Sequence, residues 1–177
     1  LLMFKKIIHN KNKGILFLIT GLPGSGKTAI AKRIKKKISN LYGPTLEVSG
    51  NNLRKILKWN KYTQKSRDEH IMNYFFFAKM ITDQKINLIF NVVGMYEKFR
   101  SQIKKIDNYV EIYIKANIYK IIKLKKKPIY LHNKKNIVGL DIKPEFPKKP
   151  DIVIENDFNK NTDELAKELL KKIQKLV

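Results

Sequence analysis

The sequence contains no cysteine, which excludes several kinds of site at once. Disulfide bonds, zinc sites built on thiolates and a cysteine nucleophile all need that side chain. There is also no apolar run near the roughly 20 residues that a membrane-spanning helix needs. At the start of the chain an apolar tetrapeptide precedes lysines, the reverse of the order in a secretory signal. We therefore expect a cytoplasmic protein without a membrane partner.

Acidic residues are scarce relative to basic ones. The chain has 15 Asp and Glu residues against 38 Lys and Arg, which gives a formal net charge of +23. Most of the excess is lysine, scattered along the chain with abundant Ile and Asn, a mixture typical of A/T-rich coding sequences. A basic chain can bind nucleic acid or attract small anionic substrates. Because the sequence has no single basic block, a nucleic-acid partner is not expected, and a polynucleotide substrate is only an alternative.

Arginine is also rare. Only four positions carry it: Arg33, Arg54, Arg67 and Arg100. The planar guanidinium holds a phosphate through two parallel hydrogen bonds, which the lysine ammonium cannot do. A chain that prefers lysine so strongly is expected to keep arginine where this geometry matters.

Apolar runs and amphipathic stretches alternate along the 177 residues. Strands are expected at 14–20, 45–48, 86–93, 109–114 and 151–154, and helices at 27–39, 66–84 and 162–176. This alternation predicts an α/β fold, a three-layer sandwich in which a five-stranded parallel sheet has helices on both faces. The length suits one domain over residues 1–177.

Two local features refine this prediction. Ser66, followed three residues later by Glu69, has the spacing of a capping box at the start of the second long helix. Residues 125–150 are rich in Lys, Pro and Asn and show no period. A long irregular segment inside a compact domain is typical of a functional loop, so we predict a lid at about residues 125–145.

The segment between the first strand and the first helix matches the phosphate-binding pattern G-x-x-x-x-G-K-[ST] in full. Its glycines allow a tight loop with inward-pointing amides. Lys27 can reach the β- and γ-phosphates, and the Thr28 hydroxyl is the expected Mg²⁺ ligand. We therefore predict a P-loop NTPase-type fold with ATP and Mg²⁺ as cofactors. The expected ATP-binding residues are Gly21, Leu22, Pro23, Gly24, Ser25, Gly26, Lys27 and Thr28.

Four later segments correspond in order to motifs of one known family. Residues 49–54 read S-G-N-N-L-R where that family has D-G-D-N-x-R, and residues 62–70 stand at its F-S-E-E-D-R-x-x-N. Residues 93–100 correspond to I-S-P-Y-R-x-x-R, and residues 136–147 to N-F-T-G-I-D-x-P-Y-E-x-P. With the phosphate loop, these segments make the chain resemble adenylylsulfate kinase over residues 14–177.

The resemblance implies an ATP-dependent kinase that phosphorylates the ribose 3′-hydroxyl of a small nucleotide acceptor. It also leaves a homodimer possible, because such kinases are often dimers. Arg100 corresponds to a further family arginine. The residues that the resemblance implies are catalytic are Lys27, Ser49 and Asn52. Those that it implies bind the acceptor are Asn51, Arg54, Tyr62, Arg67, His70, Ile137 and Val138.

The chain departs from the family at both motif aspartates. Ser49 replaces the first, which in the family helps to hold Mg²⁺, and Asn51 replaces the second. Glu47, Asp68 and Glu69 are candidate substitutes, although each also fits a surface or capping carboxylate. Because phosphoryl transfer depends mainly on positioning and electrostatics, a missing base need not abolish activity. A nucleotide-binding protein with weak or no catalysis is therefore one alternative.

The residues expected around the acceptor base have changed as well. Family members stack adenine between two aromatic rings; Tyr62 keeps one, whereas Ile137 replaces the other. His70 replaces an asparagine and could contact a base edge. Losing one stacking face should weaken binding of a purine more than that of a smaller pyrimidine. These changes favour cytidine diphosphoramidate, the acceptor of one relative in capsule modification, over adenylylsulfate, whose phosphorylation in sulfate activation is the main alternative.

Overall fold

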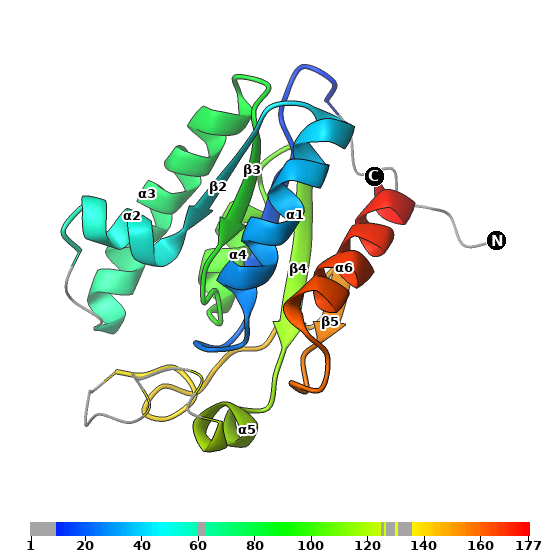
Figure 1. Ribbon diagram of the computed structural model, residues 1–177. Coiled ribbons are helices and arrows are strands. Elements are labelled where there is room, and N and C mark those ends of the chain that lie inside the picture. Colours follow the sequence, from blue (N-terminus) through cyan, green and yellow to red (C-terminus); the bar gives the residue numbers. More distant parts are fainter. Residues whose placement is uncertain (1–9, 60–62, 125, 127–129, 131–135) are drawn as a thin grey trace.

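The fold is built on a sheet of five parallel strands (Figure 1). The computed structural model describes residues 10–59, 63–124, 126, 130 and 136–177. The strands lie in the order β2-β3-β1-β4-β5, and every neighbouring pair is parallel. Their bounds are β1 Leu16–Thr20, β2 Thr45–Ser49, β3 Asn87–Asn91, β4 Tyr109–Lys115 and β5 Ile152–Glu155.

Helices cover both faces of this sheet (Figure 1). Two long helices, α1 (Lys27–Tyr42) and α6 (Thr162–Leu176), pack side by side on one face. The opposite face carries α3 (Gln64–Thr82) and α4 (Glu97–Ile103). Two short helices, α2 (Gly50–Ile56) and α5 (Ile118–Lys123), follow β2 and β4 directly.

The central strand β1 is apolar at every position except its last residue, Thr20. All five of its residues are fully buried. Phe17 and Ile19 pack with α1 and α6, whereas Leu16 and Leu18 pack with α3 and α4. A parallel strand covered on both faces needs apolar side chains at every position, because successive side chains point to opposite faces. The predicted three-layer α/β fold with a five-stranded parallel sheet is confirmed.

The predicted strands and long helices are all present, but the bounds differ. Helix α1 runs to Tyr42 instead of residue 39, and it ends at Gly43, whose φ of 95° suits glycine. The helices α2, α4 and α5 were not predicted. They have only seven, seven and six residues, too few for a 3.6-residue period to be visible. In the described part of the chain, none of the helices is both long and apolar enough to span a membrane.

The predicted capping box at Ser66 is wrong. Helix α3 begins at Gln64, and the Thr63 side chain caps it by accepting a hydrogen bond from the Ser66 amide at 3.3 Å. Ser66 lies inside the first turn, where its hydroxyl donates to the Thr63 carbonyl at 3.0 Å. Thr63 and Ser66 form a simple N-cap and not a capping box, because the Ser66 hydroxyl bonds the Thr63 carbonyl and not the Thr63 amide.

The described part of the predicted lid packs against the phosphate loop. Ile137 and Val138 are buried in a small apolar cluster with Leu22 and Met95. The Tyr130 hydroxyl donates to the Val138 carbonyl at 3.3 Å, and burial raises the pKa of Tyr130 to about 12. Lid residues 125, 127–129 and 131–135 lie outside the described residues.

Candidate active site

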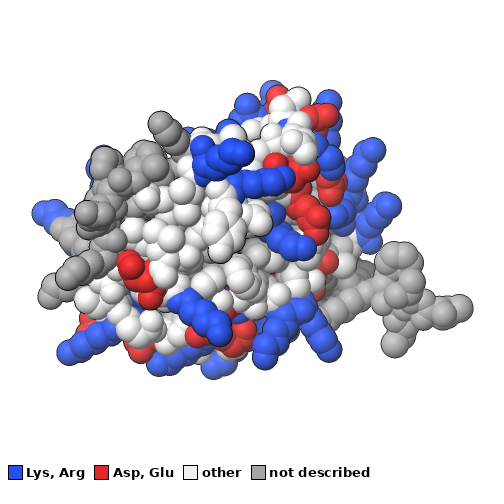
Figure 2. Space-filling view, turned by 90° about the horizontal axis from the view of Figure 1, so that it is seen from below, with Lys and Arg blue, Asp and Glu red and all other residues white. Residues whose placement is uncertain are grey.

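A cavity of about 640 Å³ opens at the carboxyl ends of the parallel strands. Open α/β sheets bind their ligands at this edge. The walls come from the loop after β1, the ends of β2 and β3, the helices α2 and α3, and residues 136–138. Figure 2 looks onto this end of the molecule and shows Lys and Arg around a largely uncharged centre. The fold thus brings together segments that are far apart in the sequence.

The phosphate loop forms one end of this cavity and has the backbone that its glycines predict. Gly21 has a φ of 152°, and a Cβ there would lie 2.6 Å from the Ile114 carbonyl oxygen. Gly26, at φ 95°, is the N-cap of α1, so the free amides of the first turn and the positive end of the helix lie at the cavity. Of the predicted ATP-binding residues, three are buried within the loop and do not line the cavity: Gly21, Leu22 and Ser25. The others line the cavity: Pro23, Gly24, Gly26, Lys27 and Thr28.

Lys27 is held inside the loop. Its ammonium donates to the carbonyls of Gly21 at 2.9 Å and Leu22 at 2.7 Å, and the side chain is largely buried. Its charge is therefore held against two carbonyls of the phosphate loop, at the edge of the cavity. That Lys27 contacts the β- and γ-phosphates of a nucleotide stays a prediction.

Thr28 connects the phosphate loop to the neighbouring strands. Its hydroxyl donates to Asn91 Oδ1 at 2.8 Å, and Asn91 is the last residue of β3. The Asn91 amide nitrogen in turn donates to Glu47 Oε1 at 2.5 Å. Sequence reasoning considered Glu47 but missed Asn91, because the pairing of β2 with β3 brings these two side chains together.

Ser49 lies at the cavity, where the family places an aspartate, but its hydroxyl caps a helix. The Ser49 oxygen accepts a hydrogen bond from the Asn52 amide at 3.1 Å and so begins α2. Asn51 lines the cavity, whereas Asn52 is exposed and does not. The backbone of Asn52 therefore fixes Ser49, and its side chain points elsewhere.

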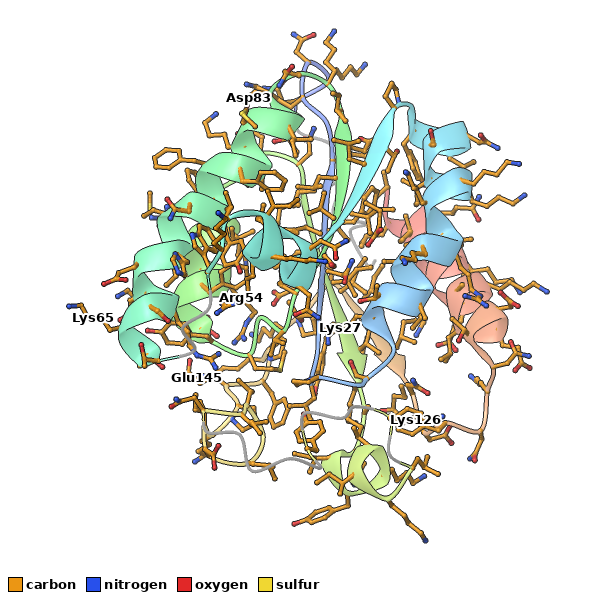
Figure 3. The ribbon with its side chains drawn as sticks, turned by 60° about the vertical axis from the view of Figure 1, so that its left-hand side comes forward. Lys27, Arg54, Lys65, Asp83, Lys126 and Glu145 are labelled. Atoms are coloured by element: carbon orange, nitrogen blue, oxygen red, sulfur yellow. The ribbon has the colours of Figure 1, made fainter. Side chains whose placement is uncertain are left out.

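Two arginines and a histidine line the opposite part of the cavity. Arg54 comes from α2, while Arg67 and His70 come from α3. Arg67 also donates to the Asn136 carbonyl at 3.0 Å, which ties α3 to the described part of the lid. Figure 3 shows Arg54 on the α2 side and Lys27 on the α1 side of the same end of the sheet. The predicted acceptor residues Ile137 and Val138 also line the cavity, whereas Tyr62 lies outside the described residues.

The Trp59 ring packs against the His70 ring. The two rings stack with centroids 3.7 Å apart and an interplanar angle of 8°, and Tyr74 packs edge-on against Trp59. His70 lines the cavity and Trp59 does not. Burial, together with the positive charge of Arg54, lowers the pKa of His70. Sequence reasoning missed Trp59, although it is the only tryptophan of the chain.

The described residues that line the cavity include no Asp or Glu. They do include five cations: Lys27, Arg54, Arg67, Lys126 and Lys160. Of the other two candidate substitutes for the missing aspartate, Asp68 accepts a hydrogen bond from the hydroxyl of Tyr96 at 2.6 Å, which lowers the pKa of Asp68. Glu69 is exposed and does not line the cavity.

The Arg100 side chain is buried and contacts other groups of the protein. It is 3% exposed and donates to the carbonyls of Gly94 and Glu145, both at 2.6 Å. It also pairs with Glu97 at 2.6 Å and lies 3.4 Å from Glu111. Arg100 therefore fastens the end of the lid to the segment after β3, and it does not line the cavity.

The model of the family described as "Adenylylsulphate kinase" matches residues 13–155, which include the phosphate loop, both cavity arginines and the described part of the lid. The chain belongs to the adenylylsulfate kinase family. Kinases of this family use ATP, so the chain is a phosphotransferase with a hydroxyl acceptor.

The relatives of this adenylylsulfate kinase family member include kinases named for two different acceptors. Cytidine diphosphoramidate kinase of Campylobacter jejuni is 32% identical over 168 residues, 92% of this chain and 98% of that protein. Adenylyl-sulfate kinase of Clostridium acetobutylicum is also 32% identical, over 87% of this chain and 80% of that protein. The APS kinase of Mycobacterium tuberculosis, solved with AMPPNP and APS, has the same fold: its TM-score is 0.81 at 20% identity, with 92% of this chain and 98% of that chain covered.

Proposed function

We propose that this kinase transfers the γ-phosphoryl group of ATP to the ribose 3′-hydroxyl of a small nucleotide conjugate, and that cytidine diphosphoramidate is favoured over adenylylsulfate. The observation that supports the proposal is the shared cavity. It joins Lys27 and Thr28, which suit a donor triphosphate, to Arg54, Arg67 and His70, which suit an anionic nucleotide acceptor. A donor and an acceptor held in one cavity can react without a diffusive step.

On the donor side, the loop amides, the start of α1 and the Lys27 ammonium would bind the ATP phosphates. The donor set also fits Mg²⁺. The Thr28 hydroxyl lies at the cavity with its proton donated to Asn91, which leaves its oxygen lone pairs for a hard cation. When bound, Mg²⁺ would neutralise negative charge on the β- and γ-phosphate oxygens.

On the acceptor side, Arg54 and Arg67 would hold the anionic linkage of the conjugate. Each guanidinium can give two parallel hydrogen bonds to a phosphate or phosphoramidate oxygen pair. Arg67 lies on α3 and also donates to the Asn136 carbonyl, so one side chain would couple acceptor binding to the described part of the lid.

The base-binding part of the cavity supports a pyrimidine. Ile137 stands where family members have a second aromatic ring, so a purine would lose stacking on that face. His70 presents a ring held by Trp59, and its lowered pKa favours the neutral form at pH 7. A neutral imidazole has one donor and one acceptor, which suits the edge of cytosine.

The chain would accelerate transfer mainly by positioning and by charge. Among the described residues no carboxylate lines the cavity, so no carboxylate base is in place there for the acceptor hydroxyl. Phosphoryl transfer has a loose transition state, in which the developing charge on the transferred group matters more than strong activation of the nucleophile. The Lys27 ammonium would stabilise that charge, while Arg54 and Arg67 position the acceptor.

Two alternatives have specific support. The relative from Clostridium acetobutylicum is as similar in identity as the one from Campylobacter jejuni, which supports adenylylsulfate as the acceptor. The carboxylate-free lining supports a nucleotide-binding protein with weak catalysis. A homodimer and a cytoplasmic location stay predictions.

A panel of nucleotide conjugates tests the proposal directly. The purified protein is incubated with ATP, Mg²⁺ and each conjugate, and the gain of one phosphate is scored by mass. We expect phosphate on cytidine diphosphoramidate at a rate above that on adenylylsulfate. ATP that is bound but never consumed, with any conjugate, would instead favour the nucleotide-binding alternative.

A further inference from the structure

Three side chains from three separate elements form a hydrogen-bonded chain beside the phosphate loop. Thr28 opens α1, Asn91 ends β3, and Glu47 lies in β2. The Thr28 hydroxyl donates to Asn91 Oδ1 at 2.8 Å, and Asn91 Nδ2 donates to Glu47 Oε1 at 2.5 Å and to the Val48 carbonyl at 3.3 Å. Asn91 is 3% exposed, so both ends of its amide are committed inside the protein.

The carboxylate at the end of this chain fixes the direction of every proton in it. An ionised carboxylate can only accept hydrogen bonds, so Glu47 turns the Asn91 NH₂ group towards itself. The Asn91 oxygen then faces Thr28 and takes the only proton of that hydroxyl. The Thr28 oxygen keeps its lone pairs for the cavity. A flipped Asn91 would donate to Thr28 and compete for those lone pairs.

The position of Asn91 has a known use in P-loop enzymes. In many of them an aspartate near the phosphate loop shares the Mg²⁺ site with the loop Ser or Thr. Asn91 occupies such a place, because β3 pairs with β1 and Ile19 lies opposite Asn91. The amide has the right oxygen but no charge. The negative charge stands one residue further away, on Glu47, which does not itself line the cavity.

We propose that Glu47, acting through Asn91, is the positioning residue that replaces the missing motif aspartate in this chain. Glu47 orients Asn91 so that the oxygens of Asn91 and Thr28 favour a divalent cation with the bound nucleotide, and it adds the negative charge that Ser49 and Asn51 lack. The inference rests on the proposed kinase function, because it assumes a nucleotide–Mg²⁺ complex in the cavity.

Two features of the site support this role. The five cations of the cavity can bind nucleotide phosphates without metal, so a divalent ion needs a local anion to be favoured there. Asp68, another candidate substitute for the aspartate, accepts from the Tyr96 hydroxyl at 2.6 Å and lies 3.7 Å from Lys98. Glu47 is thus the carboxylate that connects to the loop threonine.

The test measures how Mg²⁺ changes the affinity for ADP, by calorimetry, and so does not depend on turnover. ADP is titrated into the protein in EDTA and at a series of Mg²⁺ concentrations. The variants are Glu47→Gln, which removes the charge at constant shape, and Glu47→Gln with Asn91→Asp, which exchanges the amide and the carboxylate. Asp83→Asn is the matched control, because Asp83 lies at the opposite end of the molecule from Lys27 (Figure 3).

We expect Glu47→Gln to raise the Mg²⁺ concentration for half-maximal enhancement of ADP binding by about tenfold, the usual size of outer-shell effects on metal sites. ADP affinity in EDTA should stay unchanged. The exchanged pair should restore the wild-type Mg²⁺ dependence, and Asp83→Asn should leave it unaltered. A merely structural role for Glu47 would change the ADP affinity in EDTA and would not be rescued by the exchange.

Equal Mg²⁺ dependence in the wild type and Glu47→Gln would overturn the inference while leaving the proposed kinase intact. If Glu47→Gln does not fold, the Mg²⁺ dependence of the double variant Glu47→Gln with Asn91→Asp decides the question. Wild-type Mg²⁺ dependence in that variant supports the role of Glu47, and a loss of it overturns that role. A wild-type protein that binds no ADP under any condition would overturn the proposed function itself and this inference with it.

Discussion

His70 stacks face to face on Trp59, with ring centroids 3.7 Å apart and the planes only 8° from parallel. Trp59 follows α2, and His70 lies in α3, so the contact fastens two elements that both border the cavity. Because Trp59 does not line the cavity, it would act on the proposed acceptor site through His70 and not by direct contact.

Removing this support should weaken the acceptor site alone. We expect Trp59→Ala to raise the acceptor KM by about 2- to 10-fold, since an aromatic pair is worth about 0.5–1.5 kcal/mol beyond its buried area. The ATP KM should not change, because the Trp59 ring contacts His70 and Tyr74 of α3 and does not line the cavity. Steady-state kinetics with each substrate varied in turn measures both values. Phe76→Ala, at an exposed ring of α3, is the control. An equal rise in both KM values would contradict the assignment.

Lys27 is expected to carry the largest single share of donor-phosphate stabilisation. Lys27→Ala removes a buried ammonium that contacts two loop carbonyls, and it should lower kcat by about 100-fold or more. Circular dichroism should show an intact fold, since α1 begins on the Gly26 cap. Turnover close to that of the wild type would contradict the proposed donor site.

The two cavity arginines should affect the acceptor more than ATP. Arg54→Lys and Arg67→Lys keep the charge and lose the planar fork, so each should raise the acceptor KM by about tenfold. Arg33→Lys is the matched control, because Arg33 pairs with Asp163 on the surface. A rise in the ATP KM without a rise in the acceptor KM would show that the donor and acceptor sites have been assigned the wrong way round.

The lowered pKa of His70 makes a prediction about stability and pH. Burial and Arg54 favour the neutral ring in the folded state, so the unfolded chain binds a proton more readily near the usual pKa of about 6.5. This contribution to stability is present above about pH 6.5 and is lost as the pH falls towards the lowered folded value. The urea midpoint of the wild type should therefore fall below pH 6.5 more steeply than that of His70→Gln. Parallel curves would contradict the direction of the shift.

The phosphate loop and the sheet could be predicted because their signals are local. The run at residues 15–19 is apolar at every position, and the spacing of Gly21 to Thr28 places Lys27 and Thr28 without knowledge of the fold. Other contacts depend on how distant elements pair. Asn91 meets Glu47 only because β2 and β3 are in register, and Trp59 meets His70 only because the segment after α2 turns back onto α3.

Two predicted residues show why a motif position does not determine what a side chain does. Ser49 stands where a catalytic aspartate was expected, but its hydroxyl caps α2. Arg100 matches a family arginine, and its fork contacts protein carbonyls and carboxylates instead of the cavity. In both cases the local backbone decides which group the side chain reaches.

Ile137 is the residue whose replacement should move acceptor preference back towards a purine. Ile137→Phe restores a ring at a position that lines the cavity. We expect kcat/KM for adenylylsulfate to rise while that for cytidine diphosphoramidate changes little or falls. Ile142→Phe, in the same part of the lid and outside the cavity lining, is the control. No gain with adenylylsulfate would mean that Ile137 does not determine base preference.

The most direct measurement is kcat/KM of the unmutated protein for cytidine diphosphoramidate and for adenylylsulfate, at saturating ATP and Mg²⁺. One stacking face is worth about 1–3 kcal/mol, which corresponds to roughly a 5- to 150-fold difference. We expect the cytidine conjugate to be preferred by a factor in that range. A clear preference for adenylylsulfate would contradict the proposed acceptor and make the chain an adenylylsulfate kinase without the motif aspartates.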